Sequence, residues 1–209
     1  MEHFVITIGR QIGAGGLEIA RKLASDLGVK MYDRDLISEF AHHSGLRSEI
    51  FEQRDERPSH LKIGSFFGLR STMQGNGTAN SDSIISDEKL FEIQGDIIKE
   101  IAEKESCIIV GRCSDYILRD CPYCMNVFVA ASLSDRIPRI MELDKMTESQ
   151  ARRYIEQGDK RRAKYYNYYT FKTWGDSSSY DLCIDSSRLG GIDKSAEAIE
   201  AFMNIYFRR

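Results

Sequence analysis

The first 27 residues contain the most informative change of hydrophobic pattern in the chain. Residues 4–8 are a short apolar run rich in β-branched side chains, which is typical of a buried parallel strand. Four glycines follow within residues 9–16. Over residues 17–27, apolar side chains then recur at helical spacing, with charged side chains between them. The pattern predicts a strand, a glycine-rich turn and a helix.

Further strands are expected where apolar runs recur, and amphipathic stretches separate most of them. The expected strands are residues 4–8, 29–32, 107–110, 126–130 and 182–185. This alternation predicts one α/β domain over residues 1–209, a three-layer α/β/α fold with a doubly wound, five-stranded parallel sheet. In such a sheet, ligands bind at the carboxyl ends of the strands.

Several helix ends are also signalled by single residues. Gly28 is placed to cap the first helix at its carboxyl end. Ser132 begins a helix, and Thr147 with Gln150 three positions later forms a capping signal. The helix that follows is expected to run from Ala151 to about Tyr166, and a last helix spans residues 192–207.

The glycine-rich turn is a candidate phosphate site, because glycines let backbone N–H groups converge on an anion at a helix N-terminus. The dinucleotide pattern GxGxxG does not fit it. The P-loop pattern GxxxxGK[ST] fits better, with Arg10 at its first glycine and Gly16 at its lysine, and no hydroxyl side chain follows. An ordinary connection without a ligand is the alternative, although four clustered glycines are costly without such a purpose.

Charged residues follow two of the expected strands. Asp33 and Arg34 come after residues 29–32, and Arg112 comes after residues 107–110. A guanidinium in this place suits bidentate recognition of phosphate or carboxylate. The alternatives are that Asp33 caps a helix and that Arg112 extends over the sheet edge.

A strongly basic helix lies later in the chain and includes Arg161 and Arg162. Such a helix is most often simply solvated on its charged face. Because an aromatic and polar loop follows it, an arginine-bearing lid over a phosphate site fits the remaining pattern better.

Composition narrows the classes of function. The chain is 42% hydrophobic and 29% charged with a formal net charge of −3, so no global basic field favours nucleic acid. No apolar stretch has membrane-spanning length and no signal peptide is visible, so a cytoplasmic location is expected. The five cysteines do not predict a disulfide framework, and the pair Cys121 and Cys124 is read as loop and core rather than as a zinc or redox site.

Five segments of the sequence resemble the cytidylate kinase-like family: ITIGRQIGAGGLEIARKLA, MYDRDLI, IIVGRCSDYIL, DKRRAKYYNYYTFKTWGD and YDLCIDSSRLG. The resemblance implies a P-loop nucleoside monophosphate kinase fold. It also implies an inserted acceptor-binding region at 33–104 and a short lid-like segment at 145–180. ATP and Mg2+ would be the cofactors. A nucleotide and a small-molecule acceptor would be the partners, without nucleic acid or membrane, and the oligomeric state stays open.

The loop pattern and the resemblance together give a set of expected site residues. The ATP phosphates would be held by Arg10, Gly13, Ala14, Gly15, Gly16 and Leu17. The acceptor would be held by Asp33, Arg34, Arg112 and Asp159. The residues expected to act in catalysis are Asp33, Arg112, Arg161 and Arg162. The metal ligands stay open, with Asp33 or Glu18 able to replace the missing hydroxyl.

Two classes of function follow. One is a phosphotransferase that moves the γ-phosphate of ATP to CMP, dCMP or another small acceptor, with arginines supplying the charge of the absent lysine. The alternative is a non-catalytic, nucleotide-binding regulatory protein with a degenerate P-loop.

Overall fold

The computed structural model describes residues 3–33 and 87–208. Its centre is a parallel sheet of five strands in the order β2-β3-β1-β4-β5. The strands are β1 (Val5–Arg10), β2 (Lys30–Tyr32), β3 (Cys107–Val110), β4 (Cys124–Ala130) and β5 (Leu182–Asp185). All five expected strands are therefore present, and the prediction of a parallel sheet is confirmed.

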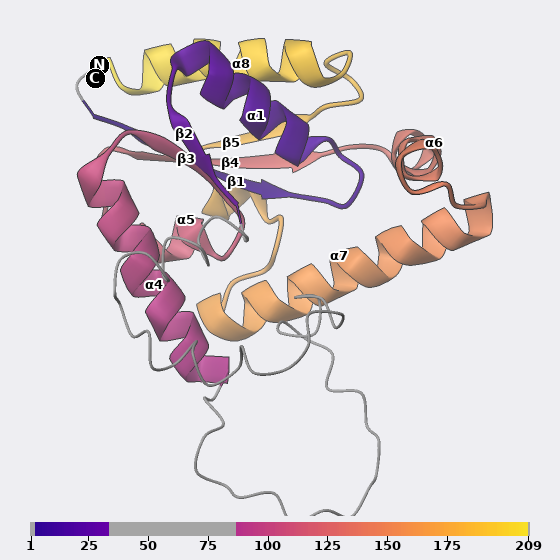
Figure 1. Cartoon of the computed structure of the whole chain (residues 1–209), viewed down its shortest axis with the longest axis horizontal. Helices are drawn as coiled ribbons and strands as arrows, with labels where there is room; N and C mark the ends of the chain where they lie inside the picture. The colour runs from indigo at the N-terminus through magenta and orange to yellow at the C-terminus, as the bar shows by residue number, and fades with distance from the viewer. Residues whose placement is uncertain (1–2, 34–86, 209) are drawn as a thin grey trace, which may run out of the picture.

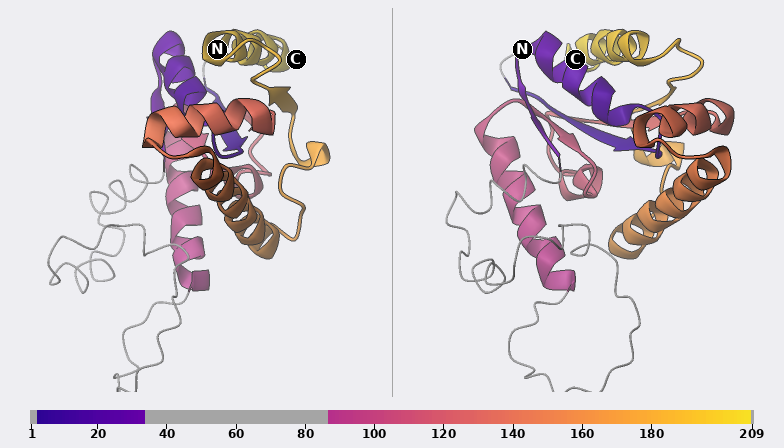
Figure 2. Two further views of the ribbon diagram at one scale, coloured as in Figure 1. Left: turned by 90° about the vertical axis from the view of Figure 1, so that its right-hand side faces the viewer. Right: turned by 45° about the vertical axis from the view of Figure 1, so that its right-hand side comes forward.

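Helices cover both faces of this sheet (Figure 1). The helices are α1 (Gly16–Leu27), α4 (Asp87–Lys104), α5 (Ser114–Ile117), α6 (Leu133–Asp144), α7 (Glu148–Thr170) and α8 (Ile192–Tyr206), with a short 3-10 turn η2 at Ser177–Ser179. Figure 1 shows α1 and α8 on one face and α4 and α5 on the other. The chain continues from β4 outward into α6, and α7 then runs back below the sheet (Figures 1 and 2).

Alternation along the strands separates two cores. Ile6 and Ile8 of β1 face α1 and α8, whereas Val5 faces α4 and α5. The neighbouring strand β3 alternates in the same way, with Ile108 on the first side and Ile109 on the second. Because each central strand is buried on both faces, these runs are almost continuously apolar, as parallel strands usually are.

A third, smaller cluster joins α6 to α7. It consists of Ile137, Ile140, Ala151 and Ile155. The partly buried Ile12 packs against it from the glycine loop, the segment 11–15 between β1 and α1. Gly158 allows this contact, because a Cβ there would lie 2.7 Å from Cγ1 of Ile12. The packing thereby brings the glycine loop against the helix pair.

The helix ends agree with the sequence signals that lie in the described residues. Gly28 caps α1 in a left-handed conformation, Ser132 caps α6, and Thr147 and Gln150 form a capping box at the start of α7. Helix α7 extends beyond the predicted residues at both ends, and α5 was not predicted.

All five cysteines are free thiols, in agreement with the expectation of no disulfide framework. Among the described residues, no helix is long and apolar enough to cross a membrane. Arg34 and most of the expected acceptor-binding insertion lie outside the described residues.

Candidate functional site

The glycine loop joins β1 to α1 at the carboxyl edge of the sheet. Gly13 and Gly15 have φ angles of 76° and 78°, in the left-handed region that other residues rarely adopt. Gly15 is the N-cap of α1 and brings no side chain to cap it. Within the described part of the chain, the N–H groups of Gly15, Gly16 and Leu17 donate to no protein acceptor. They leave an electropositive helix start suited to an anion.

Side chains from other elements hold this loop from behind. The carboxylate of Asp159 accepts a hydrogen bond from the backbone N–H of Ile12 at 2.8 Å and pairs with Nη1 of Arg136 at 2.5 Å. Arg136 also donates to the carbonyl of Ile12 at 3.2 Å. The two charged side chains are only 18% and 10% exposed, so the ion pair is largely buried. Ser186, just after β5, donates to the carbonyl of Ala14 at 2.8 Å.

Helix α7 makes a second contact with the loop one turn further on. Nη1 of Arg162 donates to the carbonyl oxygen of Arg10 at 2.8 Å. Asp159 and Arg162 are three residues apart and so share one helix face. Helix α7 therefore holds the carbonyl of Arg10 and the N–H of Ile12 together, while Arg161 is exposed on another face.

The turn after β3 presents the second group of the site. Gly111, Arg112 and Cys113 have φ angles of 79°, 61° and 54°, so three consecutive residues are left-handed. This conformation is unfavourable for arginine and cysteine, and such strained backbone concentrates at functional sites. The turn ends the strand abruptly and leads into the short helix α5.

Three guanidinium groups converge between the loop and this turn. Desolvation, followed by the charges of Arg162 and Arg112, lowers the pKa of Arg10 to about 9, and the carboxylate of Asp33 opposes that shift. Arg10 is still protonated at neutral pH. Burial lowers the pKa of Arg162 as well; the carboxylate of Asp159 opposes this shift, and the charges of Arg161 and then Arg112 add to it. Clustered cations of this kind are stabilised by an anion bound among them.

The structure thus brings together Arg10, Asp33, Arg112 and Arg162 from the set expected on sequence grounds. It places Asp159 on the loop backbone, where its carboxylate is already engaged, and leaves Arg161 exposed. Two residues that support the loop, Arg136 and Ser186, were not among the expected ones. The only signal for Ser186 was its place at the carboxyl end of a strand, and Arg136 had none beyond an ordinary amphipathic helix.

An aromatic wall lies beside the β3 turn. Phe91 of α4 stacks on Tyr169 of α7 with ring centroids 4.2 Å apart, and Tyr165 packs against Tyr169 at 4.8 Å. Burial raises the pKa of Tyr165, and the nearby charge of Arg112 opposes this. Tyr166 donates to Asp115 of α5 at 2.7 Å, which fixes this half of α7 to the segment that follows the turn. The aromatic wall thus borders Arg112.

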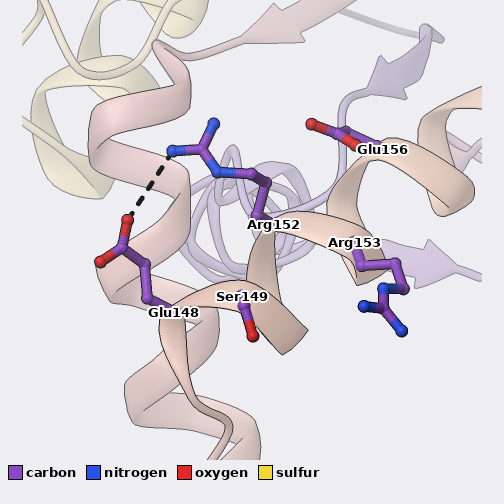
Figure 3. A pocket seen from close by; sticks show the side chains of 5 residues that line it. All are labelled: Glu148, Ser149, Arg152, Arg153 and Glu156. Atoms are coloured by element: carbon purple, nitrogen blue, oxygen red, sulfur yellow. Dashed lines mark ion pairs between the residues drawn. The ribbon is translucent and has the colours of Figure 1, made fainter.

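A surface depression along the first turns of α7 lies apart from this site (Figure 3). Its lining is Glu148, Ser149, Arg152, Arg153 and Glu156, all exposed side chains of one helix. Glu148 and Arg152 form an ion pair at 3.7 Å, drawn as a dashed line in Figure 3. Because these residues lie on the solvent face of α7, the depression does not include the convergent arginines.

Oxygen donors for a magnesium ion are few. The described residues contain no group of three or more His, Cys, Asp or Glu side chains that could hold a metal. Mg2+ in nucleotide sites is held by one or two carboxylates, phosphate oxygens and water, so a single carboxylate is enough. Glu18 pairs with Arg139 at 2.9 Å, whereas Asp33 lies at the carboxyl end of β2 near Arg10. Asp33 therefore fits this role better than Glu18.

Comparison with known proteins relates the whole chain to other sequences and structures. The chain matches a curated cytidylate kinase of Methanoculleus marisnigri at 29% identity, over 94% of this chain and 92% of that protein. A cytidylate kinase of Methanopyrus kandleri is 24% identical, over 88% and 85% of the two chains.

Solved structures agree on the fold. An uncharacterized protein from Eubacterium ventriosum has a TM-score of 0.70 and 26% identity, over 97% of this chain and 99% of that one. A shikimate kinase from Bacteroides thetaiotaomicron has a TM-score of 0.53 at 15% identity, over 96% and 98%. The architecture is thus the three-layer α/β fold of P-loop kinases. Residues 5–188 match the model of the cytidylate kinase-like family, to which this chain belongs.

Proposed function

We propose that the protein is an ATP-dependent kinase that transfers the γ-phosphoryl group to a nucleoside monophosphate. The observation that carries the proposal is the convergence of Arg10, Arg112 and Arg162 beside an uncapped helix start. Phosphoryl transfer depends mainly on positioning and on neutralising charge that is spread over phosphate oxygens. A glycine cradle with cations from three elements around it supplies both.

The residues divide the work by position. The backbone N–H groups of Gly15, Gly16 and Leu17 bind phosphate oxygens of ATP. Arg112 binds the phosphate of the acceptor, because it lies at the end of β3 on the side of the aromatic wall. Arg162 neutralises charge between them and keeps Arg10 in place through its carbonyl.

Asp33 is the carboxylate that would hold Mg2+, and the ion would supply positive charge to the phosphates of the bound nucleotide. CMP and dCMP are the first candidate acceptors, since the curated relatives are cytidylate kinases. The resemblance assigns residues 33–104 to the acceptor, and most of them, 34–86, lie outside the described residues. The identity of the acceptor therefore has to come from experiment.

The test measures ADP release from ATP and Mg2+ with CMP, dCMP, UMP, AMP and GMP, each with the wild-type protein and with Arg112→Ala. We expect turnover with at least one pyrimidine nucleotide, and a large rise in KM for that acceptor in Arg112→Ala. Turnover that does not depend on Arg112 would contradict the assigned role.

A second candidate is a regulatory protein that binds nucleotide without turnover. Gly16 favours it, because this residue occupies the position where P-loop kinases carry lysine. Tight ATP binding without ADP release for any acceptor of the panel would select this alternative over the kinase.

A further inference from the structure

Arg10 and Gly16 occupy the same small space. A Cβ atom at position 16 would lie 2.5 Å from Cβ and 2.8 Å from Cγ of Arg10. Real Cβ atoms do not approach so closely, and the first two carbons of a side chain cannot swing away as its tip can. Any side chain at position 16 is therefore incompatible with the stem of Arg10 as it lies in this fold.

The same two positions depart from the P-loop pattern in opposite directions. The pattern GxxxxGK[ST] has glycine where this chain has Arg10, and lysine where it has Gly16. In both the P-loop pattern and this chain, one of the two positions is glycine and the other carries a cationic side chain. Because the two positions touch each other, the space between them admits only one long side chain.

The guanidinium of Arg10 extends from the glycine loop toward the β3 turn. Its Nη1 lies 2.1 Å from the place that a Cβ of residue 111 would take, so it rests against the backbone of Gly111. No acceptor among the described residues receives a hydrogen bond from this guanidinium. Arg112 and Arg162 are close enough to repel it, and the carboxylate of Asp33 attracts it.

We infer that Arg10 is the cation that binds the terminal phosphates of the nucleotide in place of the P-loop lysine, and that Arg10 needs a glycine at position 16 for its space. This inference rests on the proposed function, since it assigns Arg10 to the terminal phosphates of the bound nucleotide. A guanidinium offers a planar pair of donors where lysine offers one compact charge, so it suits two phosphate oxygens at once. From the end of β1, it reaches the space between the loop and Arg112.

The steric exclusion between Arg10 and a side chain at position 16 can be tested without any ligand. Thermal unfolding is measured for Gly16→Ala in the wild-type background and in the Arg10→Gly background. We expect Gly16→Ala to lower Tm by about 4–8 °C when Arg10 is present, which is the usual effect of overpacking in a domain of this size. It should change Tm by less than about 2 °C when residue 10 is glycine. Equal shifts in both backgrounds would overturn the inference.

The binding half is tested by ATP titration calorimetry on folded variants. Arg10→Met keeps the stem and removes the charge, so its affinity for ATP should fall by about 10-fold or more while its Tm stays near that of the wild type. The double variant Arg10→Gly, Gly16→Lys places the cation where other P-loop kinases carry it. We expect this variant to recover most of the affinity that Arg10→Gly loses.

The outcomes separate the inference from the proposed function. If wild-type protein binds no ATP, the proposed function fails, whatever the unfolding experiment shows. If the wild type binds ATP and Arg10→Met binds it equally well, the kinase stands and the assignment of Arg10 is overturned. Loss in Arg10→Met with recovery in the double variant supports the assignment.

Discussion

The glycine loop and the β3 turn lie at the same edge of the sheet but reach left-handed backbone in different ways. In the loop, the left-handed positions are Gly13 and Gly15, and side chains of α6 and α7 impose the shape from behind. In the turn, Arg112 and Cys113 accept the strained conformation themselves. Under the proposed function, side chains are absent where backbone N–H groups would face the phosphates, and strain is tolerated where the side chain of Arg112 would do so.

The largest expected effect comes from removing Arg162, which both supports the glycine loop and carries a positive charge. Arg162→Ala takes away a cation near the site and the hydrogen bond to the carbonyl of Arg10. We expect turnover to fall by about 10³-fold, as for arginines that act in the transition state, with a much smaller change in nucleotide affinity. Steady-state kinetics and ATP titration on the same variant measure both quantities.

Two other arginines of α7 sharpen this test. Arg153 is exposed on the solvent face, and Arg153→Ala should leave turnover within about 2-fold of the wild type. Arg161 was expected in the site on sequence grounds, but it is exposed. We expect Arg161→Ala to lower turnover less than Arg162→Ala does, and the reverse order would show that Arg161 rather than Arg162 acts in the site.

The next effect concerns the stability of the loop. Asp159→Ala leaves Arg136 as an unpaired, buried cation and removes the acceptor of the Ile12 N–H. Breaking such a pair should cost about 3 kcal/mol of the free energy of unfolding, the lower end of the range for buried pairs, because the carboxylate is 18% exposed. Denaturant unfolding gives the total, and amide exchange at Ile12 reports the loop. Unchanged protection at Ile12 would mean that the loop keeps its shape without α7.

The β3 turn should respond in the opposite sense. Arg112→Gly relieves a left-handed arginine, so the free energy of unfolding should stay the same or rise by at most about 1 kcal/mol. The same change should lower kcat/KM for the acceptor by about 10²-fold, through loss of a charged hydrogen-bond donor. Arg112→Ala is the matched variant, which loses the same donor without relieving the backbone. A stability loss in Arg112→Gly larger than in Arg112→Ala would refute the strain argument.

The smallest effect is expected in the first turn of α1. The pair between Glu18 and Arg139 is about one third exposed on both sides, so solvent screens it. Glu18→Gln should change the free energy of unfolding by less than about 1 kcal/mol. A loss of stability as large as that of Asp159→Ala would mean that the pair between Arg139 of α6 and Glu18 of α1 is as important as the pair between Arg136 and Asp159.

The sequence predicted the fold because each signal was local. Apolar runs gave the strands, and single residues such as Gly28 and Thr147 gave helix ends that the structure confirms. The carboxyl-edge rule was enough to bring Asp33 and Arg112 to one region. None of these predictions depends on which helix packs against which loop.

The contacts that shape the site depend on such packing, and sequence spacing does not encode it. Asp159 was expected on the acceptor, but α7 packs so that its carboxylate meets Ile12 and Arg136 instead. The exclusion between Arg10 and Gly16 likewise follows only from the distance between them. The sequence showed that the lysine was missing, and only the structure shows which side chain fills its space.

Helix α7 also fixes the distance between the glycine loop and the β3 turn. Asp159 holds the glycine loop and Tyr166 holds the start of α5 just after the β3 turn, seven residues along the same helix. Seven residues are almost two full turns and about 10.5 Å of rise, so both anchors face the sheet edge. Inserting one residue between them would rotate one anchor by about 100° and release it. The distance between the glycine loop and the β3 turn can therefore change only in steps of whole helical repeats. The number of residues between Asp159 and Tyr166 fixes this distance.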